Sequence, residues 1–481
     1  MTSRFSGALQ LTDLDDFITP SQECIKPIKI DKEKSGTGAK IKIQDDGTYV
    51  QIKEGGFIEP LKRVDISLSD CLACSGCITS AESVLVTEQS QEEMMRVLKE
   101  NKLLKEENNR NAKIIVVSFS IQPLLSIAVS HNLSPLNAAE KLAGFFKRCG
   151  ADLVFDMGIA DDFALIEAQE EFLERYQSKQ FGAKYSLPML ASSCPGWVCY
   201  AEKTHGSFVL PHISTTRSPQ QIMGSLVKNY LAEGLKRSPD SMYHITLMPC
   251  YDKKLEASRS DFKNKKYETR DVDCVITPIE LEQLMQSQSV QLADEEPVEL
   301  DWLWSEFIQP PLQSHIGSGS GGYAQHIFLN AAKVLFPNVV SNLNLRVLRN
   351  QDFQELTLEH ESEVLLRFGI ANGFRNIQNL VQKIKRGKCT YDYVEVMACP
   401  SGCLNGGAQI RPKGDMTARE LTSKLDEMYR TLDVHKPEEN KAVSDLYKSW
   451  VEGCHTVKSR ALLHTSYHAL EKSSNALNIK W

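Results

Sequence analysis

Residues 392–407 read DYVEVMACPSGCLNGG, a stretch that combines a strand pattern with a cysteine pair. Its first half is apolar and rich in β-branched residues, which is typical of a strand buried inside a parallel sheet. Its second half carries Cys399 and Cys403 beside Pro and Gly, which fix a turn and let the backbone approach a ligand closely. The stretch therefore predicts a strand that ends in two ligand thiols.

Similar apolar runs recur along the chain and alternate with helical patterns at 134–150 and 218–237. The runs are IIVVSF from residue 114, ADLVFDMG from 151, LPMLASS from 187 and YHITLMPC from 243. This alternation predicts an α/β core with parallel sheets, in which ligands bind beyond the carboxyl ends of the strands. Cys194 and Cys250 follow two of these runs beside Pro. Together with the cysteines of 392–407 they could supply the four thiolates of an Fe-S cubane.

A second cysteine run, CLACSGC, places Cys71, Cys74 and Cys77 near the amino end. Its two-residue spacers allow consecutive thiolates to bind one cluster, which needs a fourth ligand from elsewhere. The spacing alone leaves zinc open as the alternative. In the same way, the cysteines of the core could each be an ordinary buried residue, although four of them at Pro- or Gly-flanked strand ends argue against that.

Composition narrows the class of protein. The chain has 13 cysteines in 481 residues and begins without a secretory signal pattern, so we expect thiols that serve as metal ligands in a reducing compartment. No apolar stretch approaches the length of a membrane span. The net charge of −7 gives no general reason to expect nucleic-acid binding.

Three segments, SSCPGW, MPCYDKKLEASR and MACPSGCLNGG, resemble the signature segments of the iron-only hydrogenases and occur in the same order. The resemblance extends to 154–172, 317–332 and 369–374, and ALLHTSYH at 461–468 is similar to the end of the hydrogenase small subunit. More specifically, the chain resembles the hydrogenase-like component of the cytosolic iron-sulfur protein assembly machinery, the nuclear prelamin A recognition factor-like family.

This resemblance implies an iron-only hydrogenase-like α/β fold with parallel sheets and a small N-terminal ferredoxin-like module. The expected division is a cluster module at 1–105, a hydrogenase-like core at 106–435, and a small-subunit-like segment with a tail at 436–481. The family pattern implies two 4Fe-4S clusters. The first would be held by Cys24, Cys71, Cys74 and Cys77, and the second by Cys194, Cys250, Cys399 and Cys403.

Departures from the hydrogenase pattern imply a protein that is not an enzyme and has no catalytic residues. Ser193 stands where hydrogenases carry a proton-delivering cysteine, and a hydroxyl is a poor acid-base group near neutral pH. Their glutamate pair reads Glu167-Ala168 here, whereas Lys253 and Glu256 are retained. We therefore expect a factor that helps cytosolic and nuclear Fe-S proteins to mature. An active hydrogenase and a cluster-stabilised adaptor remain the alternatives.

The implied partners are an early cluster scaffold, a targeting complex with a WD40-repeat protein and associated factors, and apo Fe-S client proteins. We expect no direct contact with nucleic acid, no membrane span, and a cytoplasmic location with the nucleus as a second one. The terminal Trp481 could dock into a partner's pocket.

Other conspicuous residues are expected to be structural. GSGSGG at 317–322 lacks the rest of a phosphate-binding loop, so it predicts a tight turn beside the second cluster. His315 and the C-terminal histidines show no metal-ligand spacing and are assigned surface or core roles. Structural or bystander roles are also assigned to Cys149, Cys199, Cys274, Cys389 and Cys454.

Overall fold

The computed structural model describes three strands within residues 40–60, and then residues 86, 88–178, 186–308, 310–339 and 345–469. Internal contacts divide the chain into a small unit within residues 1–83 and a large unit that runs from 84 to 481 and includes 18–20. The small unit contains an antiparallel sheet of order β1-β2-β3. Its strands are β1 (Lys40–Ile43), β2 (Tyr49–Ile52) and β3 (Ile58–Pro60).

Several predicted residues lie outside the described part of the chain. They are the proposed ligands of the first cluster and the terminal tryptophan: Cys24, Cys71, Cys74, Cys77 and Trp481. Their roles therefore stay predictions, as does the division of the chain at residues 105 and 435.

The large unit contains a four-stranded sheet whose strands are all parallel, in the order β10-β7-β4-β5. Val116 of β4 belongs to one hydrophobic core, whereas Ile115 and Val117 of the same strand belong to another, so both faces of the sheet are covered. The predicted parallel α/β character is confirmed here. The strands are β4 (Ile114–Phe119), β5 (Leu153–Asp156), β7 (Met242–Leu247) and β10 (Cys274–Ile276).

A second sheet has five strands in the order β11-β12-β13-β14-β6. Its β13, β14 and β6 run parallel, but β11, β12 and β13 form an antiparallel meander that the sequence analysis did not predict. The turn between β12 and β13 places Glu361 and Ser362 at positive φ. The strands are β6 (Met189–Leu190), β11 (Arg346–Val347), β12 (Phe353–His360), β13 (Glu363–Asn372) and β14 (Tyr393–Met397).

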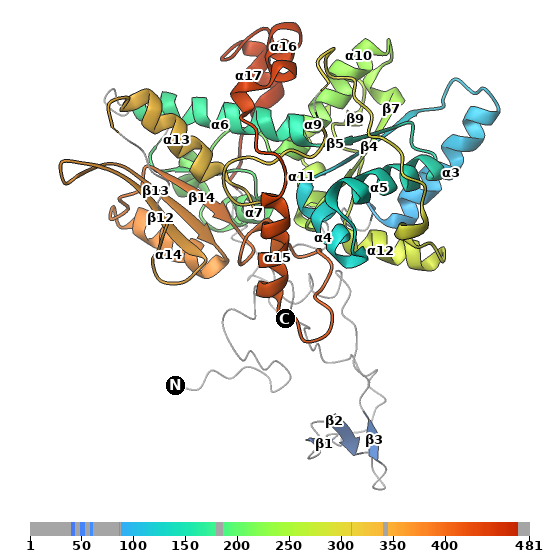
Figure 1. The fold of residues 1–481 in the computed structure, drawn as a ribbon, viewed down its shortest axis with the longest axis horizontal. Coiled ribbons are helices and arrows are strands. Elements are labelled where there is room, and N and C mark those ends of the chain that lie inside the picture. Colours follow the sequence, from blue (N-terminus) through green and yellow to red (C-terminus); the bar gives the residue numbers. More distant parts are fainter. Residues whose placement is uncertain are drawn as a thin grey trace, which may run out of the picture. The chain divides into compact units, whose positions relative to one another are not determined.

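Helices cover both sheets (Figure 1). α3, α4, α5 and α12 pack on one face of the four-stranded sheet, and α7 and α14 pack on the outer face of the five-stranded sheet. These helices are α3 (Gln91–Glu106), α4 (Ile121–His131), α5 (Pro135–Cys149), α7 (Pro195–Thr204), α12 (Pro278–Ser287) and α14 (Phe374–Lys385). The predicted helix at 134–150 is thus confirmed. Ser134 caps its start, accepting a hydrogen bond from the Asn137 N–H, and Gly150 ends it in the left-handed conformation.

The largest core lies between the two sheets and includes α6 (Gly158–Ser178), α9 (Pro219–Ser225) and α13 (Tyr323–Leu335). Phe172 of α6 packs edge to face on Phe368 of β13, with 4.9 Å between the ring centroids. α9 continues into a π-helical segment (Leu226–Leu231) and α10 (Ala232–Gly234), which together account for the predicted helix at 218–237. α6 therefore joins the two sheets.

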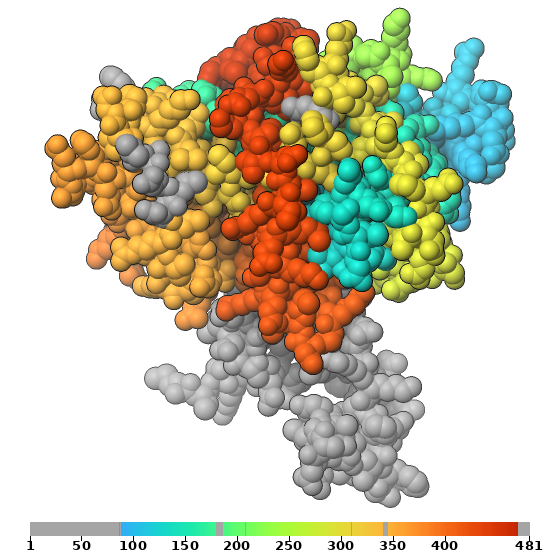
Figure 2. Space-filling model, in the orientation of Figure 1, coloured from blue at the N-terminus to red at the C-terminus, as the bar shows by residue number. Residues whose placement is uncertain are grey.

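The C-terminal part of the described chain packs across the large unit. α15 (Ala418–Arg430) contributes Leu425 and Tyr429 to a cluster with Leu125 of α4 and Leu404. Figure 2 shows the α15 segment running along the face between the parts that carry the two sheets. The last helices are α16 (Lys441–Ser449) and α17 (Val457–Leu463).

The remaining elements are short. They are α8 (Gly206–Val209), α11 (Asp252–Ala257), the hairpin β8 (Lys263–Asn264) and β9 (Thr269–Arg270), and the 3-10 turns at 210–212, 239–241, 260–262, 292–294, 403–405 and 437–439. Over the described residues, no helix combines the length and the apolar character that crossing a bilayer requires.

Candidate cluster-binding site

The cysteines predicted to hold the second cluster follow the carboxyl ends of three strands. Cys194, Cys250 and Cys399 lie two to four residues beyond the ends of β6, β7 and β14, and Cys403 begins the 3-10 turn that follows. β7 belongs to the four-stranded sheet, whereas β6 and β14 belong to the five-stranded sheet. The thiols are therefore brought together by both sheets and not by one sheet edge.

Two glycines allow these segments to approach one another. A Cβ atom at Gly196 would lie 3.0 Å from Asp252 Oδ2 and 3.2 Å from the Ala398 Cβ, so the Cys194 segment touches the other two. A Cβ atom at Gly406 would lie 2.5 Å from the Pro249 carbonyl oxygen. Because a Cβ atom would clash at Gly406 and be tightly packed at Gly196, glycine permits the close approach of the cysteine segments.

The electrostatics of the four thiols also indicate a common site. Burial, together with the neighbouring Cys194, raises the pKa of the Cys403 thiol to about 12. Burial raises the pKa of Cys250 and Cys399 well above the usual value, with contributions from Asp252 and from the other thiols of the set. Since metal ligation requires thiolates, the site needs positive charge to hold them, and iron would supply it.

The cysteine thiols that the structure describes do not form a compact group of three potential ligands for a single ion. Among the described residues, the one group of three candidate ligands whose atoms all lie within 4.8 Å is Asp162, His315 and His435, and it contains no cysteine. A single zinc ion draws its four ligands closely together, whereas each thiolate of a cubane binds a different corner. Four mutually interacting thiols, of which no three form such a compact group, are thus compatible with an Fe-S cluster.

Polar groups line the same region. The Cys194 sulfur accepts a hydrogen bond from the Ala398 N–H at 3.3 Å. The buried Lys253 ammonium donates to the Ser193 carbonyl oxygen at 3.1 Å and to Glu256 Oε2 at 2.6 Å. The Ser193 hydroxyl oxygen is buried and has no hydrogen-bond partner in the described part of the chain. A cation and an N–H donor thus adjoin the sulfur atoms, as an anionic cluster requires.

The GSGSGG segment packs against the turn between Cys399 and Cys403. The Ser320 hydroxyl donates to the Ser401 carbonyl oxygen at 2.8 Å and accepts from the Leu404 N–H at 3.2 Å. Gly322 then begins α13 in the left-handed conformation. The predicted tight turn is confirmed, and it supports the cysteine turn through hydrogen bonds.

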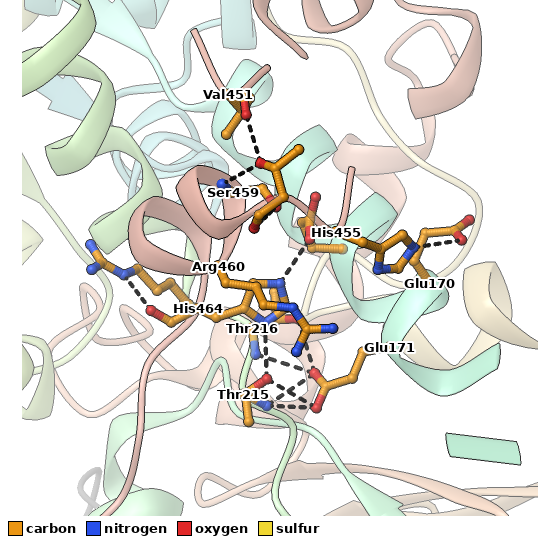
Figure 3. A network of polar contacts seen from close by, with 12 residues as sticks. Glu170, Glu171, Thr215, Thr216, Val451, His455, Ser459, Arg460 and His464 are labelled. Carbon is orange, nitrogen blue, oxygen red and sulfur yellow. Dashed lines mark hydrogen bonds and ion pairs between the residues drawn. The ribbon is translucent and has the colours of Figure 1, made fainter. Parts of the chain in front are cut away.

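Glu167 is held by the C-terminal segment. Its carboxylate accepts a hydrogen bond from the Tyr447 hydroxyl at 2.6 Å and pairs with His464 Nε2 at 2.8 Å. Figure 3 shows His464 beside Thr215, whose hydroxyl lies 2.9 Å from His464 Nδ1 and whose backbone N–H donates to Glu171 at 2.9 Å. These contacts tie the segment around α17 to α6.

The cysteines assigned structural roles lie in ordinary packing positions. Cys274 is buried in β10, Cys149 ends α5, and Cys454 is exposed. Burial raises the pKa of Cys149 to about 11 and that of Cys199 and Cys274 to about 12.

Two histidines and a buried aspartate form a polar cluster that was not expected from the sequence. His315 and His435, assigned surface or core roles, both point Nε2 at the buried Asp162 on α6. The core role expected for His315 stays a prediction, and the structure adds that His315 belongs to a group of potential metal ligands. Their sequence separations from Asp162 are 153 and 273 residues, so no local spacing could reveal the group.

Comparisons with known proteins agree with this architecture. The family model for the C-terminal domain of the iron-only hydrogenase large subunit matches residues 113–407, and the model for the iron hydrogenase small subunit matches 418–470. The fold is similar to that of an FeFe-hydrogenase from Chlamydomonas reinhardtii, with 27% sequence identity and a TM-score of 0.67, covering 78% of this chain and 98% of the other. The chain belongs to the iron-only hydrogenase-like family.

Its relatives define the group within that family. A probable cytosolic Fe-S cluster assembly factor of Anopheles gambiae is 58% identical, and a cytosolic Fe-S cluster assembly factor of Xenopus tropicalis is 53% identical, each over 100% of both chains. These relatives are named as assembly factors and not as hydrogenases. The family resemblance found in the sequence is confirmed.

Proposed function

We propose that this chain is a cytosolic Fe-S cluster assembly factor that binds a 4Fe-4S cluster through Cys194, Cys250, Cys399 and Cys403. The observation that carries the proposal is the convergence of these thiols, from strands of two sheets, in one buried region with an adjacent lysine. The cluster would supply iron and sulfide for transfer, or take up one electron. The names and high identity of the relatives support the same function.

The chain's own residues would hold and shield the cluster. The thiolates would bind iron, the Ala398 N–H would donate to the Cys194 sulfur, and the Lys253 ammonium would offset negative charge. Leu404, next to Cys403, packs against Leu425 of α15 and would limit access of water. A site enclosed in this way would exchange its cluster slowly.

We further propose that the chain is not a hydrogenase. Ser193 offers a hydroxyl in place of a thiol, and Ala168 carries no acid. Glu167, which a hydrogenase could use to carry protons, is held by Tyr447 and His464 in this chain. These three differences would interrupt proton delivery to a catalytic site.

The remaining parts of the proposal rest on the family resemblance. A second 4Fe-4S cluster would be bound by Cys24, Cys71, Cys74 and Cys77 and would exchange more readily. The chain would receive clusters from an early scaffold and work with a WD40-repeat targeting complex on apo client proteins. It would act in the cytoplasm, with the nucleus as a second location. Trp481 would dock into one of these partners.

The direct test is anaerobic iron and acid-labile sulfide analysis with EPR of the reduced protein. We expect about eight irons in the wild type and about four in either a Cys399→Ala/Cys403→Ala variant or a Cys71→Ala/Cys74→Ala/Cys77→Ala variant. A Cys274→Ala/Cys389→Ala variant is the matched control and should keep all of them. Retention of all of about eight irons in the Cys399→Ala/Cys403→Ala variant would refute the assigned ligands.

A hydrogen-evolution assay distinguishes the enzyme alternative. Protein purified anaerobically and reconstituted with a di-iron cofactor should show no turnover above a cofactor-only control. Robust turnover would overturn the assembly-factor proposal, even if the cluster ligands proved correct.

A further inference from the structure

The buried carboxylate of Asp162, in the first part of α6, contacts two imidazoles from distant segments of the chain. His315 Nε2 lies 2.6 Å from Asp162 Oδ1, and His435 Nε2 lies 2.8 Å from the same oxygen. Asp162 is 1% exposed, and the two histidine side chains are 10% and 14% exposed. The other oxygen, Asp162 Oδ2, accepts a hydrogen bond from Asn440 Nδ2 at 2.5 Å. Three potential ligand atoms, one from each residue, therefore lie within 4.8 Å of one another at a position with little exposure to solvent.

The backbone holds the two imidazoles side by side. Ser314 and Val434 form a parallel β-bridge, in which the Ser314 N–H donates to the Asp433 carbonyl oxygen and the His435 N–H donates to that of Ser314. Each histidine directly follows a residue of the bridge, and the ring centroids are 4.7 Å apart. Backbone hydrogen bonds of the bridge therefore fix the positions of the two histidines relative to each other.

Two further carboxyl groups lie near this group. Asp156 and Asp161 lie close enough to Asp162 for their charges to interact with it. His326 is also within electrostatic reach of Asp162 and both histidines. Its buried Nε2 lies 3.4 Å from Glu438 Oε1 but makes no hydrogen bond to any described residue. Carboxyl groups around imidazoles favour a bound cation.

We propose that Asp162, His315 and His435 bind a divalent transition-metal ion, with Zn²⁺ as the best match, and that this ion fastens the C-terminal segment to the core. Two imidazoles with one carboxylate suit zinc or ferrous iron, whereas calcium and magnesium prefer oxygen ligands. The site contains no sulfur and is distinct from the cysteine site. The inference therefore goes beyond the proposed function and does not depend on it.

A plain hydrogen-bonded cluster is the competing explanation. In that case both histidines carry a proton on Nε2 and share one carboxylate oxygen, and added metal changes nothing. With a bound ion, the same three atoms coordinate it, and metal content, ligand type and thermal stability all depend on them.

The test uses the full chain loaded with Zn²⁺, freed of loosely bound metal, and studied by elemental analysis and zinc X-ray absorption. Cys71→Ala/Cys74→Ala/Cys77→Ala/Cys399→Ala/Cys403→Ala serves as the background, so that zinc bound by either set of cysteines does not interfere. We expect zinc with nitrogen and oxygen ligands at about 2.0–2.1 Å. His315→Gln/His435→Gln should remove this zinc. The matched control is His131→Gln, since His131 also pairs with a carboxylate, Glu282, and should keep it.

Thermal melting with and without Zn²⁺ gives a second measurement. The midpoint should rise with Zn²⁺ in the background chain and stay unchanged in the His315→Gln/His435→Gln variant. Coordination by sulfur alone, at about 2.3 Å, or zinc content that survives the double histidine change would overturn the proposal. If the double variant does not fold, the ligand shell of the background chain still decides between nitrogen and sulfur.

Discussion

Lys253 and Glu256 form a buried ion pair three residues apart at α11, with 2.6 Å between Nζ and Oε2 and both side chains less than 10% exposed. Glu256 also accepts a hydrogen bond from the Ser218 hydroxyl. The pair lies beside Ser193, directly before the first of the cysteines that we propose as ligands.

Replacing Lys253 by Met should therefore destabilise the protein and weaken cluster retention. The change leaves the Glu256 carboxylate buried without its cation, which costs about 3 kcal/mol. The midpoint of thermal unfolding and the iron content should both fall. Lys263→Met is the control, because its pair with Glu268 is exposed and contributes less than about 1 kcal/mol. Equal effects of the two substitutions would contradict the prediction.

The Ser193 hydroxyl should be dispensable for stability. It is buried without a hydrogen-bond partner among the described residues, so Ser193→Ala removes an unsatisfied group and should leave the unfolding midpoint unchanged or slightly higher. Ser214→Ala is the matched control, because the Ser214 hydroxyl donates to Glu171 at 2.6 Å. That change should cost about 1–3 kcal/mol. A clear loss of stability in Ser193→Ala would reveal a partner for the hydroxyl.

Gly406→Ala should disturb the cysteine site through packing alone. The added methyl group would lie 2.5 Å from the Pro249 carbonyl oxygen, so the turn after Cys403 must move away from the Cys250 segment. Overpacking of this kind costs about 1–3 kcal/mol, and we expect partial loss of iron as well. Gly234→Ala provides the comparison, because no atom lies within 4 Å of its added carbon. Full iron retention in Gly406→Ala would speak against close packing of the two segments.

Glu395 should make stability depend on pH. Burial raises the pKa of its carboxyl from 4.5 to about 7, although the N–H groups of Ala324 and Gly322 oppose the shift. Between these two values the unfolded chain loses the proton and the folded chain keeps it. Stability should therefore fall as the pH rises from about 4.5 to 7 and then level off, by at most roughly 3 kcal/mol.

Melting curves of the wild type and Glu395→Gln at pH 5 and pH 8 would check this. The advantage of the wild type over the variant should be larger at pH 5, because glutamine does not titrate. Tyr323 and Tyr393 also face Glu395, but they stay protonated over this range because burial raises the pKa of both well above the usual value. Glu359→Gln, at an exposed position of β12, should change nothing. Identical pH dependence in all three chains would refute the assignment to Glu395.

The strands and helices of the core could be predicted because their signals are local. Apolar runs, the Pro and Gly residues beside cysteines, and the Ser-Pro start and Gly end of α5 are all visible within a few residues. The meander of β11, β12 and β13 was missed because its apolar pattern is weaker, with two exposed positions at the hairpin end of each long strand.

Long-range features could be predicted only where the fold family supplied them. Nothing near Cys250 in the sequence indicates that its strand belongs to a different sheet from those before Cys194 and Cys399. Asp162 and His435 approach one another only after α6 and the Ser314–Val434 bridge have formed. Such groups depend on tertiary packing, which a reading of local periodicity does not contain.

The origin of the four core thiols in two sheets has a consequence for biogenesis. Cys250 joins the other three only when the four-stranded and five-stranded sheets have both formed and docked. A chain that has completed one sheet presents an incomplete ligand set, which cannot bind a cubane at all four corners. A complete cluster would therefore bind at this site only after both sheets have folded and docked. Partly folded chains would not take up the full complement of iron and sulfide.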